Sequence, residues 1–500
     1  MAQHATRSTR GPGLRRILGA FTVLTVAAGA VLAAPAADAA HPRDNQYWLE
    51  DYGIKEAWKV SRGDGVKVAI IDTGVDDSHP DLRDAVVGGT DSSGAGAPDG
   101  TEAIGPLPEH GTLVATMLGG RGNNSAEIKQ AEADAEKQRI AYERAKKKAE
   151  EEDEEPPEKP EPVEIPEPGP GDEGIIGVAP AADLLTASVW LGAENPAGVS
   201  IEEQIPNAVR WAVDQGAEVI NLSMGSTSTS WPQSWDDAFL YAEKNDVVVV
   251  AAAGNRAGGM TQVGAPATIP GVLTVAGVDR EREASWDAST QGITIGVAAP
   301  ADPLVGGLPG GGYAGWSGSS GAAPLVAGVA ALIRSAEPDL SAGDVINRIL
   351  ATAQDAGEPG FDNIYGYGIL DAEAALTADV ESVGTNPLGT IAEWIRVHRR
   401  ADTAPEPVPS APVDQAPSTV EPIAAPDAVA PPGRGEVMAP AVLFGFGALA
   451  LLVIVIGSVR LHRTRRLALA ERASEGTIAS SKWKVARGHD PFDDLPEKTE

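Results

Sequence analysis

The chain has no cysteine and few basic residues, and both shortages exclude classes of protein. Without cysteine there is no disulfide framework, no thiol nucleophile and no cysteine-ligated zinc. The 39 Lys and Arg residues are outnumbered by 71 Asp and Glu residues, which gives a formal net charge of −32. Nucleic-acid binding needs clustered basic side chains, so we expect no nucleic-acid partner. The hydrophobic share of 42% in 500 residues is still enough for a sizeable folded core.

The first 39 residues have the pattern of an export signal. Four arginines between residues 7 and 16 precede an uncharged apolar stretch over residues 17–34. Ala37-Asp38-Ala39 then offers an A-x-A cleavage site. We expect a signal peptide at 1–39, and the alternative is an uncleaved anchor helix. Either one exports the residues that follow.

A second apolar segment lies near the C-terminus, where no charged residue occurs between Glu436 and Arg460. About 23 helical residues at roughly 1.5 Å each span about 34 Å, which is enough for the core of a bilayer. Arg460 and three further arginines follow at once, and the positive-inside rule places them in the cytoplasm. We expect a transmembrane helix at 437–459 and a cytoplasmic tail at 460–500, with the bulk of the chain outside the cytoplasmic membrane. A buried core helix is the alternative interpretation of this segment.

Two further segments have compositions unlike a folded core. Residues 386–436 are rich in Pro and Ala and are expected to form an extended linker. Residues 125–173 form an acidic insertion whose first half, rich in Ala, Glu and Lys, predicts an exposed helix with Glu143 and Lys147 as an i,i+4 pair. Its second half carries seven prolines and cannot be helical. The insertion is either a solvated, mobile segment without chemistry or an arm that binds a partner.

The remaining body, which we place at residues 40–385, alternates short β-branched runs with amphipathic helices. The runs predict strands at Val66–Ile71, Val219–Leu222, Val247–Val250 and Val272–Val275, and the patterns between them predict helices at Ile205–Asp214 and Trp235–Lys244. This alternation is typical of an α/β fold with a mostly parallel central sheet flanked by helices. Active sites in such sheets lie at the carboxyl ends of the strands.

Two ionisable residues occupy positions that suit acid–base chemistry. Asp72 directly follows the first strand, where a rigid, partly desolvated carboxylate can orient a histidine. A turn or helix-capping aspartate is the structural alternative. His110 opens an apolar helical pattern that runs to Leu118, and Gly111 permits close backbone approach. Taken alone, this histidine is more simply explained as structural.

A serine and an asparagine complete the set. Ser320 lies at the start of an apolar helix over Leu325–Ile333, where a serine caps the helix or exposes its hydroxyl beside inward-pointing N–H groups. Asn255 follows a hydrophobic strand, so its side-chain amide either stabilises an oxyanion or fills a turn.

The order Asp, His, Ser along the chain is that of subtilisin, not that of chymotrypsin or the α/β-hydrolases. The chain resembles the subtilisin-like serine proteases in several co-linear motifs: Ala69–Asp76, His79–Leu82, His110–Thr112, Gly177–Pro180, Asn221–Gly225, Ala253–Asn255 and Gly318–Pro324.

This resemblance implies a serine endopeptidase with a defined set of site residues. It makes Asp72, His110 and Ser320 the catalytic triad and Asn255 the oxyanion-hole residue. It also implies that an extended substrate binds along Ser223, Met224 and Gly225, with Ala253 and Gly254 nearby. We expect no cofactor and no metal.

Three positions depart from the family pattern around the motifs. Glu109 stands where glycine is usual before the histidine, and its charge either raises the imidazole pKa or faces solvent. Ser319 replaces threonine. Gly321 replaces methionine or phenylalanine after the serine, and we expect it to weaken the helix start and leave space beside the nucleophile.

The arrangement of segments narrows the resemblance further. Only about 32 residues separate Ala39 from Asp72, which leaves no room for a separate folding pro-domain between them. The chain resembles the mycosins, which are membrane-anchored proteases of type VII secretion systems, in its order of signal peptide, protease domain, proline-rich linker and one C-terminal span. It departs from them in one respect, since mycosins commonly carry cysteines. The resemblance implies exported protein substrates, secretion-channel partners and anchorage in the lipid bilayer. A mainly structural scaffold of the channel, or a general surface subtilase, remains an alternative.

The expected topology gives a direct prediction. A protease added to intact cells should remove the residues before Glu436 and leave the tail after Arg460 protected, because the bilayer shields the cytoplasmic side. Immunoblots with an epitope at each end measure this. Digestion of the tail in unpermeabilised cells contradicts the predicted span.

Overall fold

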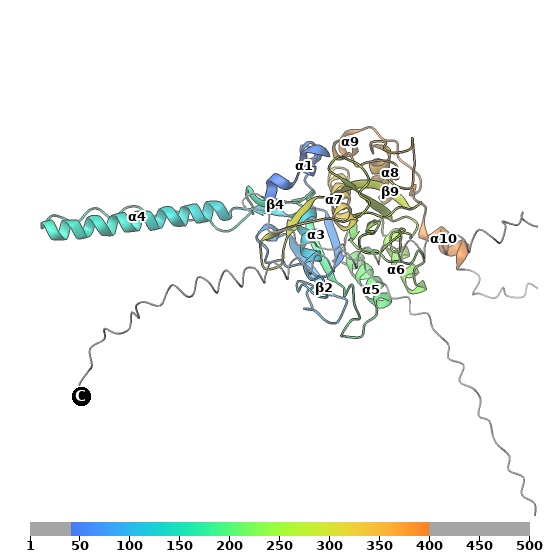
Figure 1. The fold of residues 1–500 in the computed structure, drawn as a ribbon, viewed down its shortest axis with the longest axis horizontal. Helices are drawn as coiled ribbons and strands as arrows, with labels where there is room; N and C mark the ends of the chain where they lie inside the picture. Colours follow the sequence, from blue (N-terminus) through green and yellow to red (C-terminus); the bar gives the residue numbers. More distant parts are fainter. Residues whose placement is uncertain (1–41, 400–500) are drawn as a thin grey trace, which may run out of the picture. The chain divides into compact units, whose positions relative to one another are not determined.

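The computed structural model describes residues 42–399. These residues are drawn in colour in Figure 1. The expected signal peptide, transmembrane helix, cytoplasmic tail and most of the linker lie outside the described residues and stay predictions.

A seven-stranded sheet forms the centre of the body, and every neighbouring pair of its strands is parallel. Across the sheet the strands are β2 (Val86–Asp91), β5 (Asp183–Ser188), β1 (Lys67–Asp72), β6 (Val219–Leu222), β7 (Val248–Ala252), β8 (Leu273–Asp279) and β9 (Ile295–Asp302). The expected α/β fold with a mostly parallel sheet is confirmed. The inner strands are continuous apolar runs because helices cover the sheet and leave neither face of them exposed to water.

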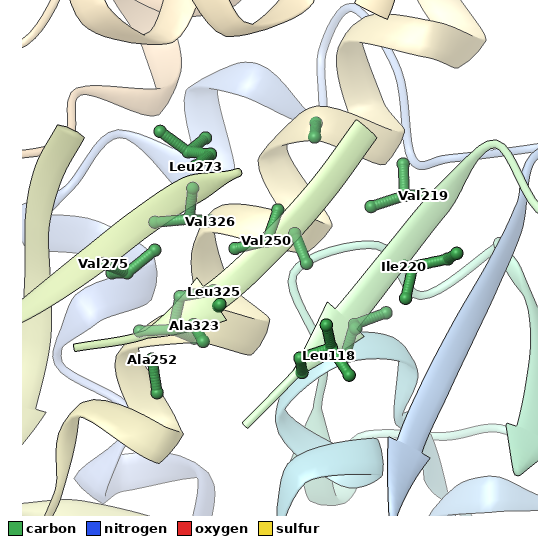
Figure 2. Close-up of a cluster of buried hydrophobic side chains, with 14 of the residues drawn as sticks. Leu118, Val219, Ile220, Val250, Ala252, Leu273, Val275, Ala323, Leu325 and Val326 are labelled. Atoms are coloured by element: carbon green, nitrogen blue, oxygen red, sulfur yellow. The ribbon is translucent and has the colours of Figure 1, made fainter. Parts of the chain in front are cut away.

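The main helices of the body are α3 (His110–Gly119), α5 (Ile201–Asp214), α6 (Asp236–Lys244), α7 (Ser319–Ala336), α8 (Ala342–Ala351) and α9 (Ala372–Thr377), after two short helices α1 (Trp48–Asp51) and α2 (Ile54–Ala57). Helix α7 is buried along most of its length and packs against α3 and against β6 to β9. Figure 2 shows Ala323, Leu325 and Val326 of α7 gathered with Val250 and Val275 of the sheet. Among the described residues, α7 alone is long and apolar enough to cross a membrane, and its burial identifies it as the core helix.

Two small antiparallel sheets lie outside the main one, and the sequence patterns did not predict them. Strands β10 (Leu304–Gly307) and β11 (Tyr313–Trp316) form a hairpin just before α7. Strands β3 (Arg121–Asn123) and β4 (Glu173–Ile176) pair at the two ends of the acidic insertion. The insertion therefore leaves the body and returns to it at one place.

The first half of the insertion is helix α4 (Ser125–Glu152), as expected. It has no extensive packing against any other helix or strand of the described part of the chain. Ion pairs at i,i+4 line its second half, but Lys147 pairs with Glu151 and not with Glu143. Its less exposed positions are Ile128, Ala131, Ala135, Gln138, Tyr142 and Ala149, which repeat every three or four residues. That spacing marks one stripe along the helix.

The second half of the insertion runs back along the helix (Figure 1). Residues 154–172 contain no helix or strand, and Figure 1 shows them running back beside α4. Their less exposed positions are Pro157, Pro160, Val163, Pro166 and Gly169, a repeat of three. Three residues per turn is the period of a polyproline II helix. The insertion is therefore a paired helix and extended segment, and only one of its side chains, that of Ala149, is fully buried.

The folded body continues past residue 385, where we expected it to end. Helix α10 (Ile391–His398) packs on α6, and its Ile391 is buried. The Ile391 N–H donates to Glu243 Oε2 over 2.7 Å, and Arg399 pairs with Asp236. Residues 386–399 contain only one Pro and one Ala, and the Pro- and Ala-rich composition begins at Ala401, so the boundary at 385 was set too early.

Deleting residues 126–172 and joining the ends with a short glycine turn should leave the body folded. The paired strands β3 and β4 already hold the two ends together, and the insertion adds little buried surface. We expect the midpoint of thermal unfolding to change by about 2 °C or less, against a drop of several degrees for Ile391→Ala, which removes a buried side chain. A fall for the deletion as large as that control would show that the insertion stabilises the body.

Candidate active site

Asp72 and His110 meet where β1 ends and α3 begins. Asp72 is the last residue of β1 and is 1% exposed, and His110 is the first residue of α3. The ring Nδ1–H of His110 donates to Asp72 Oδ1 over 2.7 Å. This bond fixes the tautomer in which Nε2 carries the lone pair and can accept a proton.

Thr73 and two glycines make this meeting possible. The Thr73 N–H donates to Asp72 Oδ1 over 2.7 Å, and Thr73 Oγ1 accepts from the Gly111 N–H over 3.0 Å. A Cβ at Gly111 would overlap the carbonyl oxygen of Gly74. The close backbone approach expected at Gly111 is therefore present, and it ties the start of α3 to the end of β1.

The surroundings of His110 raise its pKa above the usual value. Burial is the largest influence and lowers the pKa, because it disfavours the charged ring. The charge and the hydrogen bond of Asp72, together with the charge of Glu109, outweigh burial and raise the pKa. Of the two alternatives for Glu109, the structure favours the one in which its charge raises the pKa of the His110 imidazole.

Ser320 lies in the first turn of α7, and its neighbourhood is shared with His110. The residue is 8% exposed, and its hydroxyl makes no hydrogen bond to any described residue. The Trp316 ring meets the His110 ring edge-on at 5.8 Å between centroids, and it also borders Gly321 beside the serine. Catalytic hydrogen bonds often tighten only when substrate binds, so an unbonded serine beside the histidine fits a nucleophile at rest.

Asn255 points its amide toward the same place. Its Oδ1 accepts from the N–H and the hydroxyl of Ser319 over 2.9 and 3.0 Å. Its Nδ2 makes no hydrogen bond to a described residue, yet it is not sealed from solvent. Gly318 allows this approach, since a Cβ there would lie 2.9 Å from Nδ2. Ser319 thus orients the amide, and Nδ2 remains available to an oxyanion.

The residues expected to bind substrate lie at the ends of the neighbouring strands β6 and β7. The main-chain groups of Ser223, Met224 and Gly225 make no main-chain hydrogen bond to other described residues, so they form an unpaired edge. Ala253 and Gly254 differ: the N–H of Ala253 bonds to Val275, and the carbonyl of Gly254 bonds to Thr290. The first segment can therefore pair with an extended peptide, while the second serves as a wall.

The space expected beside Ser320 at Gly321 is absent. A Cβ at Gly321 would overlap Leu304 Cδ1, and Trp316 lies just over 3 Å away. Leu304 comes from β10 and is buried. The small residue therefore accommodates a side chain from the hairpin and opens no cavity, and the expectation of added room was wrong.

The other histidine in a family motif, His79, supports the hairpin and stands apart from the triad. Its ring is buried, its Nδ1 accepts from the Asp81 N–H, and its Nε2 lies 3.2 Å from the carbonyl of Gly312 in the β10–β11 turn. Sequence reasoning did not assign roles to Thr73, Trp316 or His79, because their contacts join segments that are far apart in the chain.

Comparisons with known proteins find similar chains and structures. Subtilisin DY from Bacillus licheniformis is 32% identical over 318 residues, which cover 63% of this chain and 92% of that one. The structure of fervidolysin from Fervidobacterium pennivorans, a keratinolytic enzyme related to subtilisin, gives a TM-score of 0.53 at 25% identity and covers 72% of this chain and 51% of that one. The structure of MycP1 with its N-terminal propeptide removed gives 0.47 at 26% identity, covering 68% and 98%.

A family model points the same way. Residues 63–368, more than half of the chain, match the model of the subtilase family. That range includes the whole of the sheet and all three residues of the expected triad. The chain therefore belongs to the subtilase family of subtilisin-like serine proteases.

Proposed function

We propose that this chain is a serine endopeptidase in which Asp72, His110 and Ser320 are the catalytic triad. The observation that carries the proposal is the 2.7 Å bond between Asp72 and His110, made beside the helix that bears Ser320. The bond leaves His110 Nε2 as the ring nitrogen that can accept a proton, and α7, which begins at Ser319, packs against the helix that carries this histidine. Orientation of the base and an available nucleophile are the two requirements of nucleophilic catalysis by serine.

The chemistry follows from the atoms in place. His110 Nε2 takes the proton of the Ser320 hydroxyl as its oxygen attacks the peptide carbonyl, and the ring then gives that proton to the leaving amine. Asp72 stabilises the imidazolium that forms between these steps. The carbonyl oxygen becomes an oxyanion, and Asn255 Nδ2 and the N–H of Ser320 in the first turn of α7 are its donors. Water then attacks the resulting ester. His110 takes the proton of the water and returns it to the Ser320 oxygen as the ester bond breaks.

The substrate is an extended polypeptide. The unpaired edge at Ser223–Gly225 supplies main-chain groups that pair with a strand of substrate, which holds any sequence in register. The unpaired edge lies beside the proposed triad at the ends of the parallel strands. Main-chain pairing along this edge needs no free end of the substrate, so the site suits cleavage within a chain. We therefore assign proteins and peptides as substrates.

The cellular setting of this activity is proposed from the sequence. An export signal, a spacer and one span with a basic flank support a protease held at the outer face of the cytoplasmic membrane. This layout resembles the mycosins, so we propose that the chain cleaves exported proteins as the mycosin of a type VII secretion system. A scaffold role in the channel would need the fold and not the triad, and the variants below separate the two.

Ser320→Ala and His110→Ala should each reduce peptidase activity by about 10⁴–10⁶, because neither residue acts without the other. The double variant should lose little more. Peptide hydrolysis by the full-length protein measures this, and assays of secretion in cells carrying Ser320→Ala show whether export also needs catalysis. Losses that multiply in the double variant would mean that the two residues act independently, which contradicts the triad.

The raised pKa of His110 predicts where activity appears as pH rises. The ring must be neutral to accept a proton, so the acid limb should lie above the reference imidazole value of about 6.5. Glu109→Gly and Glu109→Gln should both move the limb to lower pH, because each removes a charge that favours the imidazolium. Rates of peptide hydrolysis between about pH 5 and about pH 9 measure the limb. Glu132→Gln, which removes an exposed charge from helix α4, is the control, and a limb unmoved by both Glu109 changes rejects the role of that residue.

A further inference from the structure

A slot between the ends of β6 and β7 is filled by one methionine. Gly225 follows β6 and Gly254 follows β7, and these two strands are neighbours in the sheet. A Cβ at Gly225 would lie 2.9 Å from Met260 Cε, and one at Gly254 would overlap the same methyl group. The two glycines thus leave a gap that two ordinary residues would close, and the thioether of Met260 occupies it.

The slot adjoins the reacting atoms. Gly254 immediately precedes Asn255, and its N–H donates to Ser319 Oγ over 2.9 Å, one residue before the nucleophile. A substrate strand paired along Ser223–Gly225, with its cleaved carbonyl at Ser320 and Asn255, brings the residue before the cleaved bond next to Gly225 and Gly254. The residue whose peptide bond is cut therefore directs its side chain at the space that Met260 fills.

Met260 is held in the slot by its loop. The loop over residues 256–263 is fastened to residues 286–291 at both ends, by the Ala257 N–H to Asp287 O over 3.0 Å and the Val263 N–H to Gln291 O over 3.3 Å. Arg256 adds hydrogen bonds to the carbonyls of Trp286 and Ser289 and lies over the Trp286 ring. Met260 itself is 1% exposed. A side chain packed this closely in an anchored loop is part of the wall.

We propose that Met260 sets the specificity of the protease, by restricting the residue before the cleaved bond to glycine, alanine or serine. The inference rests on the proposed peptidase function, since it assigns the side chain that this site accepts. A large side chain can enter only by displacing a buried methionine from between two backbones, which a close-packed interior resists. Glycine, alanine and serine carry at most two heavy atoms beyond the α-carbon, so they require the least displacement of Met260.

The test compares two peptides that differ only in having alanine or phenylalanine before the cleaved bond, with the full-length protein as the enzyme. We expect the wild type to prefer the alanine peptide in kcat/KM by about 100-fold, within the range that pocket size gives. Met260→Ala should raise the relative rate of the phenylalanine peptide at least about tenfold. Met260→Leu, which keeps the slot full, should retain the wild-type preference.

Two further variants keep the result interpretable. Gln262→Ala changes an exposed side chain of the same loop and should leave the preference unchanged. Met260→Val opens the slot by less and should give an intermediate preference, which maintains the test if the alanine variant is unstable. A wild type that cleaves the phenylalanine peptide as fast as the alanine peptide overturns the proposal, as does a preference unmoved by shortening Met260.

The experiment distinguishes failure of the proposed peptidase function from failure of the specificity assignment. Cleavage of the alanine peptide that disappears in Ser320→Ala establishes the peptidase whatever Met260 does. If neither peptide is cleaved, nor a mixture of exported proteins, then the proposed function fails and the inference falls with it. If both are cleaved through Ser320 without regard to Met260, only the assignment of specificity is wrong.

Discussion

The close approach of α3 to the end of β1 is the constraint on which the site depends. Only glycine fits at position 111 against the carbonyl of Gly74, and the contact delivers His110 to Asp72. Asp72 is buried, and its Oδ2 has no hydrogen-bond partner among the described residues, so its charge relies on the donors at Oδ1. A buried carboxylate with few donors strongly favours a positive ring beside it. In the proposed reaction, the same arrangement orients His110 as the base and stabilises the imidazolium that forms.

The order of the strands in the sheet brings the other residues of the site together. Strands β1, β6 and β7 are adjacent, so Asp72, the edge at Ser223–Gly225 and the wall at Ala253–Asn255 follow neighbouring carboxyl ends. Helix α7 crosses these strands and begins beside Asn255, which brings Ser320 to the same place. The β10–β11 hairpin then supports both catalytic helices, with Trp316 against His110 and Leu304 against Gly321. The proposed catalytic residues thus lie at one edge of the sheet, with one added hairpin beside them.

Sequence reasoning predicted the parts of this protein that depend on local pattern. Buried parallel strands are uninterrupted apolar runs, so β1, β6, β7 and β8 were found within a few residues, and the motifs around Asp72, His110 and Ser320 are contiguous in the chain. Sequence reasoning failed where a residue contacts another residue that lies far away in the chain. Leu304, 17 positions earlier in the chain, fills the space that a side chain at position 321 would occupy. Met260 fills a slot between the ends of two strands, and the glycines that leave this slot look like ordinary turn residues in the sequence. The packing of α10 on α6 was missed because residues 386–399 were grouped with the Pro-rich segment that follows them. The return of residues 154–172 beside α4 (Figure 1) was missed because composition alone does not show where a segment lies.

Reaction with a fluorophosphonate probe tests the central claim most directly, because the probe bonds only to a serine whose proton an oriented base removes. The account predicts one adduct per chain, located on Ser320 by mass spectrometry of the digested protein. The adduct should be lost in His110→Ala, and it should form far more slowly in Asp72→Asn, where the ring is no longer held in its tautomer. An adduct on another serine, or labelling of Ser320 that persists without His110, would contradict the triad.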